Sequence, residues 1–167
     1  MSRGFVKEED QEEIPLVPPR ANLPKGVTNY VTQVGMDKLQ AEKQSLNDEK
    51  ANLDTTSESE KRIASNHIKA KLQLLNDRIA EARIVNLADQ PQDEVRFGAS
   101  VSLKIGSAKG LQTYQIVGVD EADIAEGKIS FTSPIAKLLI NKKVGDKAIL
   151  ELKNEDRVFE IMKISYG

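Results

Sequence analysis

The chain has 167 residues, of which 39 % are hydrophobic and only 4 % aromatic, with no tryptophan. Its formal net charge of −2, from 24 basic and 26 acidic residues, excludes a chain that binds polyanions over its whole surface, so any nucleic-acid contact has to be local. The absence of cysteine excludes disulfides, thiolate metal sites and cysteine nucleophiles. No apolar run approaches the length that spans a membrane, so we expect a cytoplasmic protein without membrane contact.

Residues 1–29 are predicted to form an extended or disordered tail. The acidic run KEEDQEE is followed by IPLVPPRANLPKG, which contains four of the six prolines. Proline fixes φ and removes a backbone donor, so a regular helix or strand is not expected here. The apolar residues Ile14, Leu16 and Val17 leave docking on a partner open as an alternative.

Residues 30–86 are predicted to form an antiparallel α-helical coiled coil. In the first arm, Leu39, Leu46 and Leu53 recur at every seventh residue, and Thr32 is the expected N-cap. The second arm repeats the alternation of three and four at Ile68, Leu72, Leu75, Ile79 and Ala82. The short polar turn NLDTTSESEKR joins the two arms, which predicts a helical hairpin.

Residues 87–94, LADQPQDE, are predicted to be a linker before a second domain at residues 95–167. In VRFGASVSLKI the apolar residues alternate with polar ones, which is typical of a half-buried strand. Further strands are predicted in TYQIVGV, KISF, KAILEL and RVFEIMKI. Between them, SPIAKLLINKK indicates a short helix with Ser133 as its N-cap and Pro134 at its first position, and the whole chain is α+β.

Motifs of catalysis and of cofactor binding are absent from the sequence. It contains no P-loop, no GxSxG, no zinc-ligand spacing and no GxGxxG. The only histidine, His67, lies in the middle of a predicted helix with no nucleophile paired to it. We therefore expect a protein that is not itself an enzyme and has no cofactor of its own.

The segment YQIVGVDEADIAEGKISFTSPIAKLLINKKVGDKAIL, residues 114–150, resembles the C-terminal domain of the bacterial transcript-cleavage factors GreA and GreB. The family pattern I-V-G-x-D-E-A-D, then I-S-x-x-S-P-I-A-[RK]-x-L-[IL]-x-K, then a G-D turn, is present in order and without gaps. The resemblance covers about residues 30–167. It implies an N-terminal antiparallel coiled coil followed by a small FKBP-like domain with an antiparallel sheet.

The resemblance implies a monomer that binds RNA polymerase at its secondary channel and modulates elongation and backtracking, with nascent RNA as a further contact. The polymerase-binding positions of the family carry over onto Asp120, Glu121, Asp123, Ser133, Pro134 and Lys137. A carboxylate cluster at a strand exit suits a basic partner surface. The alternative is that the acids only solubilise a loop and that the Ser-Pro pair only starts a helix.

The hairpin turn departs from the family, in which acidic tip residues help to hold a second Mg²⁺ at the active site of the polymerase. The tip candidates here are Asp54, Glu58 and Glu60, but Asp54 and Glu58 are four residues apart where the family has three. Both arms are also shorter, by roughly two heptads together, and a heptad adds about 10 Å of helix. Ser57 and Glu60 fit a capping box without any metal. The sequence therefore predicts weak or no cleavage, and the alternative is an active Mg²⁺-dependent cleavage factor using Asp54 and Glu58.

Overall fold

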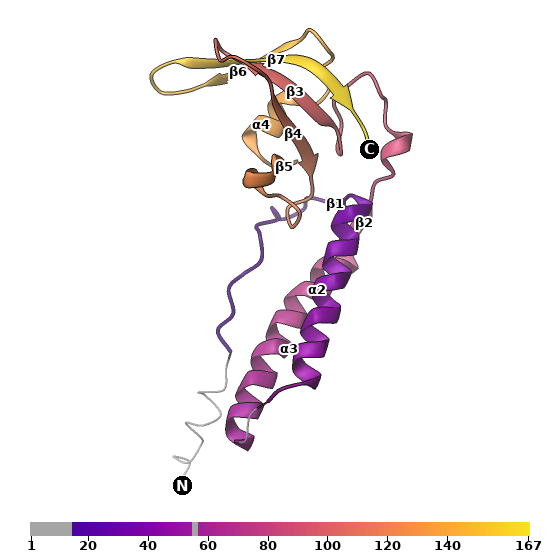
Figure 1. The fold of residues 1–167 in the computed structure, drawn as a ribbon, viewed down its shortest axis with the longest axis vertical. Helices are drawn as coiled ribbons and strands as arrows, with labels where there is room; N and C mark the ends of the chain where they lie inside the picture. Colours follow the sequence, from indigo (N-terminus) through magenta and orange to yellow (C-terminus); the bar gives the residue numbers. More distant parts are fainter. Residues whose placement is uncertain (1–14, 55–56) are drawn as a thin grey trace. The chain divides into compact units, whose positions relative to one another are not determined.

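The computed structural model describes residues 15–54 and 57–167 (Figure 1). In chain order, the helices, the short 3-10 helices η2 and η3 and the strands are β1 (Asn29–Val31), α2 (Gln33–Ala51), α3 (Glu58–Glu81), β2 (Ala82–Ile84), η2 (Leu87–Asp89), β3 (Ser100–Ile105), β4 (Gln112–Val117), η3 (Ile124–Glu126), β5 (Lys128–Ser130), α4 (Pro134–Leu139), β6 (Lys147–Glu151) and β7 (Asp156–Ser165). The chain divides into two compact units. The helical unit comprises Met1–Arg20 and Lys38–Glu81, and the C-terminal unit comprises Ala21–Asp37 and Ala82–Gly167.

In the helical unit, α2 and α3 lie side by side along a seam of leucine and isoleucine (Figure 1). The seam residues predicted from the heptad spacing are buried or partly buried: Leu39, Leu46, Leu53, Ile68, Leu72, Leu75 and Ile79. Spacings of three and four place these side chains on one stripe of each helix, so each helix covers the apolar stripe of the other. The prediction of a helical hairpin is confirmed.

The predicted helix does not continue to residue 86. Ala82–Ile84 is a strand that pairs in parallel with Asn29–Val31, and the Val85 amide donates to the Val31 carbonyl at 2.9 Å. Ile84 and Val85, two consecutive β-branched residues shortly after α3, favour extended backbone. Pairing with β1 gives this extended segment partners for its backbone hydrogen bonds. Because of this strand pair, the division between the two units differs from the boundaries predicted at residues 30 and 86.

The larger sheet of the C-terminal unit has the strand order β5-β4-β3-β7-β6 and curls beside α4 (Figure 1). The prediction of a purely antiparallel sheet is wrong for one pair, because β4 and β5 run parallel. The turn through η3 carries the chain back to Gln115 of β4, opposite which β5 begins, and this makes a parallel pair possible. Leu139 of α4 is fully buried in one core with Leu103 of β3 and Ile161 of β7.

Strand β3 begins at Ser100, five residues later than the alternation predicts. Gly98 interrupts the strand with a φ of +91°, which glycine adopts without strain. A Cβ atom at Gly98 would lie 2.0 Å from Cδ2 of Leu87, so the linker side chain packs directly on the glycine backbone. The apolar residues on either side of Gly98, Val95 and Ala99, are nevertheless fully buried.

Residues 15–28 contain no helix or strand, as the proline content predicts, but they are not free of contacts. The Arg20 guanidinium donates to both carboxylate oxygens of Glu42 on α2, at 2.6 and 3.0 Å. Leu16 is 88 % exposed. The first fourteen residues of the predicted tail, including Ile14, lie outside the described residues.

Candidate functional site

Both segments predicted to bind a partner leave the sheet at the same end. In the parallel pair of β4 and β5, Val117 is opposite Ser130, and the Phe131 amide donates to the Val117 carbonyl at 2.9 Å. Parallel neighbours have their carboxyl ends at one edge, so the loop after β4 and the segment leading into α4 start beside each other. The structure thus brings the acidic loop and the Ser-Pro helix start together at one edge of the C-terminal unit.

Glu121 turns inward at this edge. Its side chain is only 3 % exposed. The Thr32 hydroxyl donates to Oε1 at 2.5 Å, and the Lys128 ammonium lies 3.7 Å from Oε2. A buried carboxylate needs such partners because loss of hydration is costly. The geometry gives Glu121 a structural contact at the base of the loop, whereas its predicted contact with a partner stays untested.

Asp120 and Asp123 are the more accessible acids of the loop. Asp120 is partly exposed, and Asp123 is exposed. The Asp123 carboxylate accepts a hydrogen bond from the Ala125 amide at 3.1 Å and so caps η3, while its backbone exchanges two hydrogen bonds with Lys128. These contacts fix the loop backbone and leave negative charge at the surface.

The helix start at Ser133 follows the prediction. The Ser133 hydroxyl accepts from the Ala136 amide at 3.3 Å, and Pro134 occupies the first turn of α4. Pro134 and Lys137 are both exposed, because the opposite side of α4 carries the buried Ala136. This face therefore offers a rigid apolar ring and a cation beside the loop that carries Asp120.

Sequence reasoning identified Thr32 as a helix cap but missed its second role. Its hydroxyl accepts from the Gly35 amide at 2.9 Å while donating to Glu121, a residue 89 positions away. A Cβ at Gly35 would lie 2.7 Å from the Glu121 carboxylate, so a larger residue there would displace this carboxylate. The contact of Lys128 with Glu121 was also not predicted from the sequence. These residues adjoin a cleft of about 670 Å³ in the C-terminal unit. A buried partner so distant in the sequence leaves no local signal.

The hairpin turn carries its acids on the surface. Asp54, Glu58 and Glu60 are all exposed, and the Glu60 amide donates to the Ser57 hydroxyl at 3.3 Å, as the predicted cap requires. Thr55 and Thr56 lie outside the described residues. Within residues 15–54 and 57–167, no group of three or more histidine, aspartate or glutamate side chains is placed to hold a metal ion.

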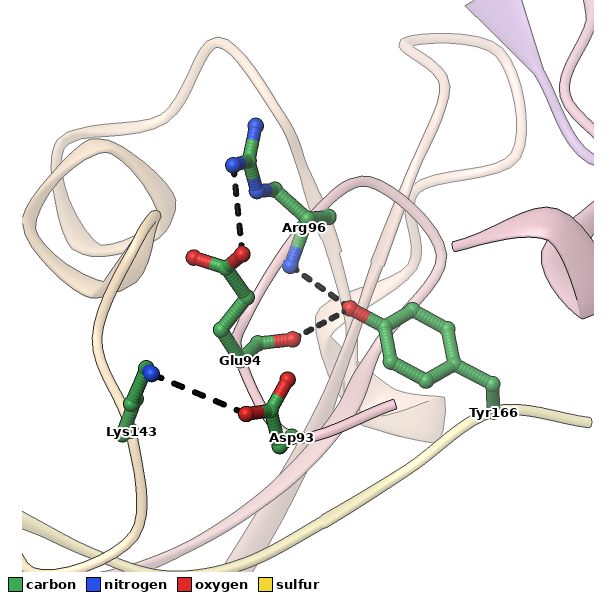
Figure 2. Close-up of polar contacts among 5 residues, drawn as sticks. All are labelled: Asp93, Glu94, Arg96, Lys143 and Tyr166. Carbon is green, nitrogen blue, oxygen red and sulfur yellow. Dashed lines mark hydrogen bonds and ion pairs between the residues drawn. The ribbon is translucent and has the colours of Figure 1, made fainter. Parts of the chain in front are cut away.

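A polar network fastens the end of the linker to the end of the chain (Figure 2). The Tyr166 hydroxyl donates to the Glu94 carbonyl at 2.6 Å and accepts from the Arg96 amide at 2.8 Å. Burial raises the pKa of the Tyr166 hydroxyl above 10.0, against the lowering effect of the bond from Arg96. An ion pair between Asp93 and Lys143 at 3.6 Å adjoins it. These contacts hold the backbone of Glu94 and Arg96, at the start of the C-terminal domain, against Tyr166, which directly follows β7.

Comparison with known families finds a match for the C-terminal domain. Residues 90–166 match the family "Transcription elongation factor, GreA/GreB, C-term". This segment of the chain is therefore similar to the C-terminal domain of GreA/GreB factors. The transcription elongation factor GreA of Maricaulis maris is 41 % identical over 100 residues, covering 60 % of this chain and 64 % of the relative. GreA of Rhizobium leguminosarum bv. trifolii is 38 % identical over 104 residues, covering 62 % and 66 %. The chain thus spans slightly less than two thirds of the length of these GreA relatives.

Solved structures of GreA/GreB-type proteins are more distant. A GreA factor homolog, Gfh1, of Thermus thermophilus is 22 % identical with a TM-score of 0.37, over 83 % of this chain and 99 % of that one. A GreA/GreB elongation factor from Nitrosomonas europaea is 16 % identical with a TM-score of 0.42, over 82 % and 98 %. In the described part of the chain, no helix has the length and apolarity needed to cross a membrane.

Proposed function

We propose that this chain is a Gre-type transcription elongation factor, cytoplasmic and monomeric, that binds RNA polymerase at the secondary channel and modulates elongation and backtracking. In this proposal the C-terminal unit is an FKBP-like domain that grips the polymerase, and α2 and α3 form the coiled coil that enters the channel, where contact with nascent RNA follows. The chain is not itself an enzyme and needs no cofactor of its own.

The observation that carries the proposal is the shared exit of β4 and β5. It places Asp120, which is partly exposed, on one of two segments that start together at one edge. The exposed side chains of Asp123, Pro134 and Lys137 lie on the same two segments. A surface that combines carboxylates with an exposed proline ring and one cation suits a partner surface of mainly positive charge. Because Glu121 is held inside, we place it beneath this surface as a positioning residue.

The test is equilibrium binding of the full chain to core RNA polymerase. We expect Asp120→Lys combined with Asp123→Lys to weaken binding about tenfold, since the surface charge of the loop is reversed. The matched control is Glu155→Lys with Asp156→Lys, which makes the same charge change at two exposed positions, the last residue before β7 and the first residue of β7. Equal affinity of all three proteins would refute the docking surface, and a wild-type chain that does not bind would refute the function.

Weak or no stimulation of transcript cleavage is the second part of the proposal. It is supported by the exposed, unclustered acids of the turn and by the length of α2, whose 19 residues give about 28 Å of helix. The alternative is an active cleavage factor that acts with Mg²⁺ at the polymerase active site through Asp54 and Glu58. It predicts Mg²⁺-dependent shortening of RNA in backtracked complexes that Asp54→Ala or Glu58→Ala abolishes. Shortening no faster than with polymerase alone would exclude this alternative.

A further inference from the structure

An apolar groove lies on the helical unit, between the end of α2 and the first turns of α3. It has a volume of about 330 Å³, and its apolar lining comes from Leu53, Ile63, Ala64 and Ile68. Ala64 contributes only a methyl group, which leaves space between the longer side chains around it. Ile63 is 47 % exposed, whereas Ile68, farther along the same helix, is only 2 % exposed. The hairpin therefore buries its seam but leaves an aliphatic surface open near the turn.

The polar residues of the groove lining give it negative charge. They are Glu49 on α2 and Glu60 and His67 on α3. Both glutamates are exposed, and the lining contains no lysine or arginine, so its charge is −2 when the histidine is neutral. Carboxylates beside an aliphatic floor disfavour phosphate and favour a partner that is apolar with a neighbouring cation.

We propose that this groove binds an aliphatic side chain of RNA polymerase that is flanked by a lysine or arginine. The inference rests on the proposed function, because it takes the polymerase as the partner, and it adds a second contact on the hairpin, apart from the acidic loop. Burial of the exposed half of Ile63 supplies the attraction, and the two glutamates select the charge of the neighbouring residue. The groove thus explains an exposed isoleucine that the helix seam does not use.

The first test replaces Ile63 with a benzophenone-bearing amino acid in the full chain and irradiates its complex with a transcribing polymerase. The control carries the same group at Leu111, which is 57 % exposed in the turn between β3 and β4. We expect an adduct with a polymerase subunit from position 63 and none from position 111. An adduct only with nascent RNA, or only with a second copy of the chain, would overturn the proposal.

The second test measures the affinity for core RNA polymerase. Ile63→Ser should weaken binding about fivefold, as expected for the loss of roughly half an isoleucine of buried surface. Ile63→Val should retain most of the affinity, and Leu111→Ser should have none of this effect. Glu49→Gln with Glu60→Gln should weaken binding about threefold and reduce its salt dependence. Glutamine at Glu60 keeps the capping role, and circular dichroism checks the helix content of each variant.

The outcomes separate this inference from the function on which it rests. If the wild-type chain does not bind polymerase, the proposed function fails first. Suppose instead that the wild type binds polymerase and that the Asp120→Lys, Asp123→Lys variant binds it more weakly. If Ile63→Ser then binds as tightly as the wild type and position 63 yields no polymerase adduct, only the groove proposal is overturned.

Discussion

The two units use polar contacts in opposite ways. In the helical unit, the side-chain bonds of Gln44 to Asp48 and of Gln73 to Asp77 are exposed and join residues four apart on one helix. In the C-terminal unit, the bond of Thr32 to Glu121 is buried and joins residues 89 apart. Exposed local contacts add little to stability, whereas a buried bond costs far more to break. The hairpin thus depends on its apolar seam, whereas the C-terminal unit has a buried polar link in addition to its apolar core.

The largest expected effect is in the apolar cores. Leu103→Ala removes a fully buried side chain from the C-terminal core and should cost about 3 kcal/mol, because a cavity forms. Leu46→Ala, at a seam position that is 9 % exposed, should cost about 1 kcal/mol less, since water can enter at the hairpin surface. All three tyrosines lie in the C-terminal unit, so urea unfolding followed by tyrosine fluorescence reports that unit and far-ultraviolet circular dichroism reports mainly the helices. A larger loss of stability from Leu46→Ala than from Leu103→Ala would contradict the expectation that the fully buried core position contributes more than the seam position.

The buried link between Thr32 and Glu121 comes next. Thr32→Val keeps the shape of the side chain but removes the cap of α2 and the donor to the carboxylate, so we expect a loss of about 2 kcal/mol. Thr32→Ser is the matched control, because it retains the hydroxyl, and it should stay within about 0.5 kcal/mol of the wild type. Urea unfolding measures both. A loss from Thr32→Ser as large as that from Thr32→Val would contradict this expectation, because it would mean that the methyl group contributes as much as the hydroxyl.

The Tyr166 network should contribute a smaller and pH-dependent amount. Tyr166→Phe removes both hydrogen bonds of the hydroxyl and should cost about 1 to 2 kcal/mol at pH 7. Because burial raises the pKa of Tyr166 in the folded state, its contribution is fully present below pH 10.0, the usual tyrosine pKa, and is lost as the pH rises through the raised pKa. The stability difference between wild type and variant should therefore shrink above that pH. A difference that stays constant in unfolding experiments up to high pH would contradict this assignment.

Sequence periodicity predicted the elements that repeat over several turns or pleats, whereas the short strands β1 and β2 were missed. The heptad spacing of Leu39 and Leu46 located α2, and the alternation of apolar residues located β7. Strands β1 and β2 have three residues each, too few for a period to be visible. Their pairing depends on chain segments that only the fold brings together.

The candidate site was predicted as a set of positions, not as an arrangement. Adjacent acids look alike in sequence, so nothing local indicates that Glu121 turns inward while Asp123 stays at the surface. The parallel pairing of β4 and β5, which joins the two parts of the site, depends on the path of the chain through η3. Tyr166 and Glu94 meet across 72 residues, and no spacing rule connects them.

The smallest effect is expected at the ion pair between Arg20 and Glu42 on the helical unit. Its two hydrogen bonds have good geometry, but the Glu42 side chain is 43 % exposed, so salt and water screen the charges. Arg20→Ala should therefore cost less than about 1 kcal/mol, and the loss should shrink further at high salt. Arg20→Lys, which keeps the charge but not the paired donors, is the control. Its stability should lie between that of the wild type and that of Arg20→Ala. A loss as large as that of Thr32→Val would mean that the segment before residue 21 is as strongly coupled to its unit as the buried link, and the contrast between the two units would no longer hold.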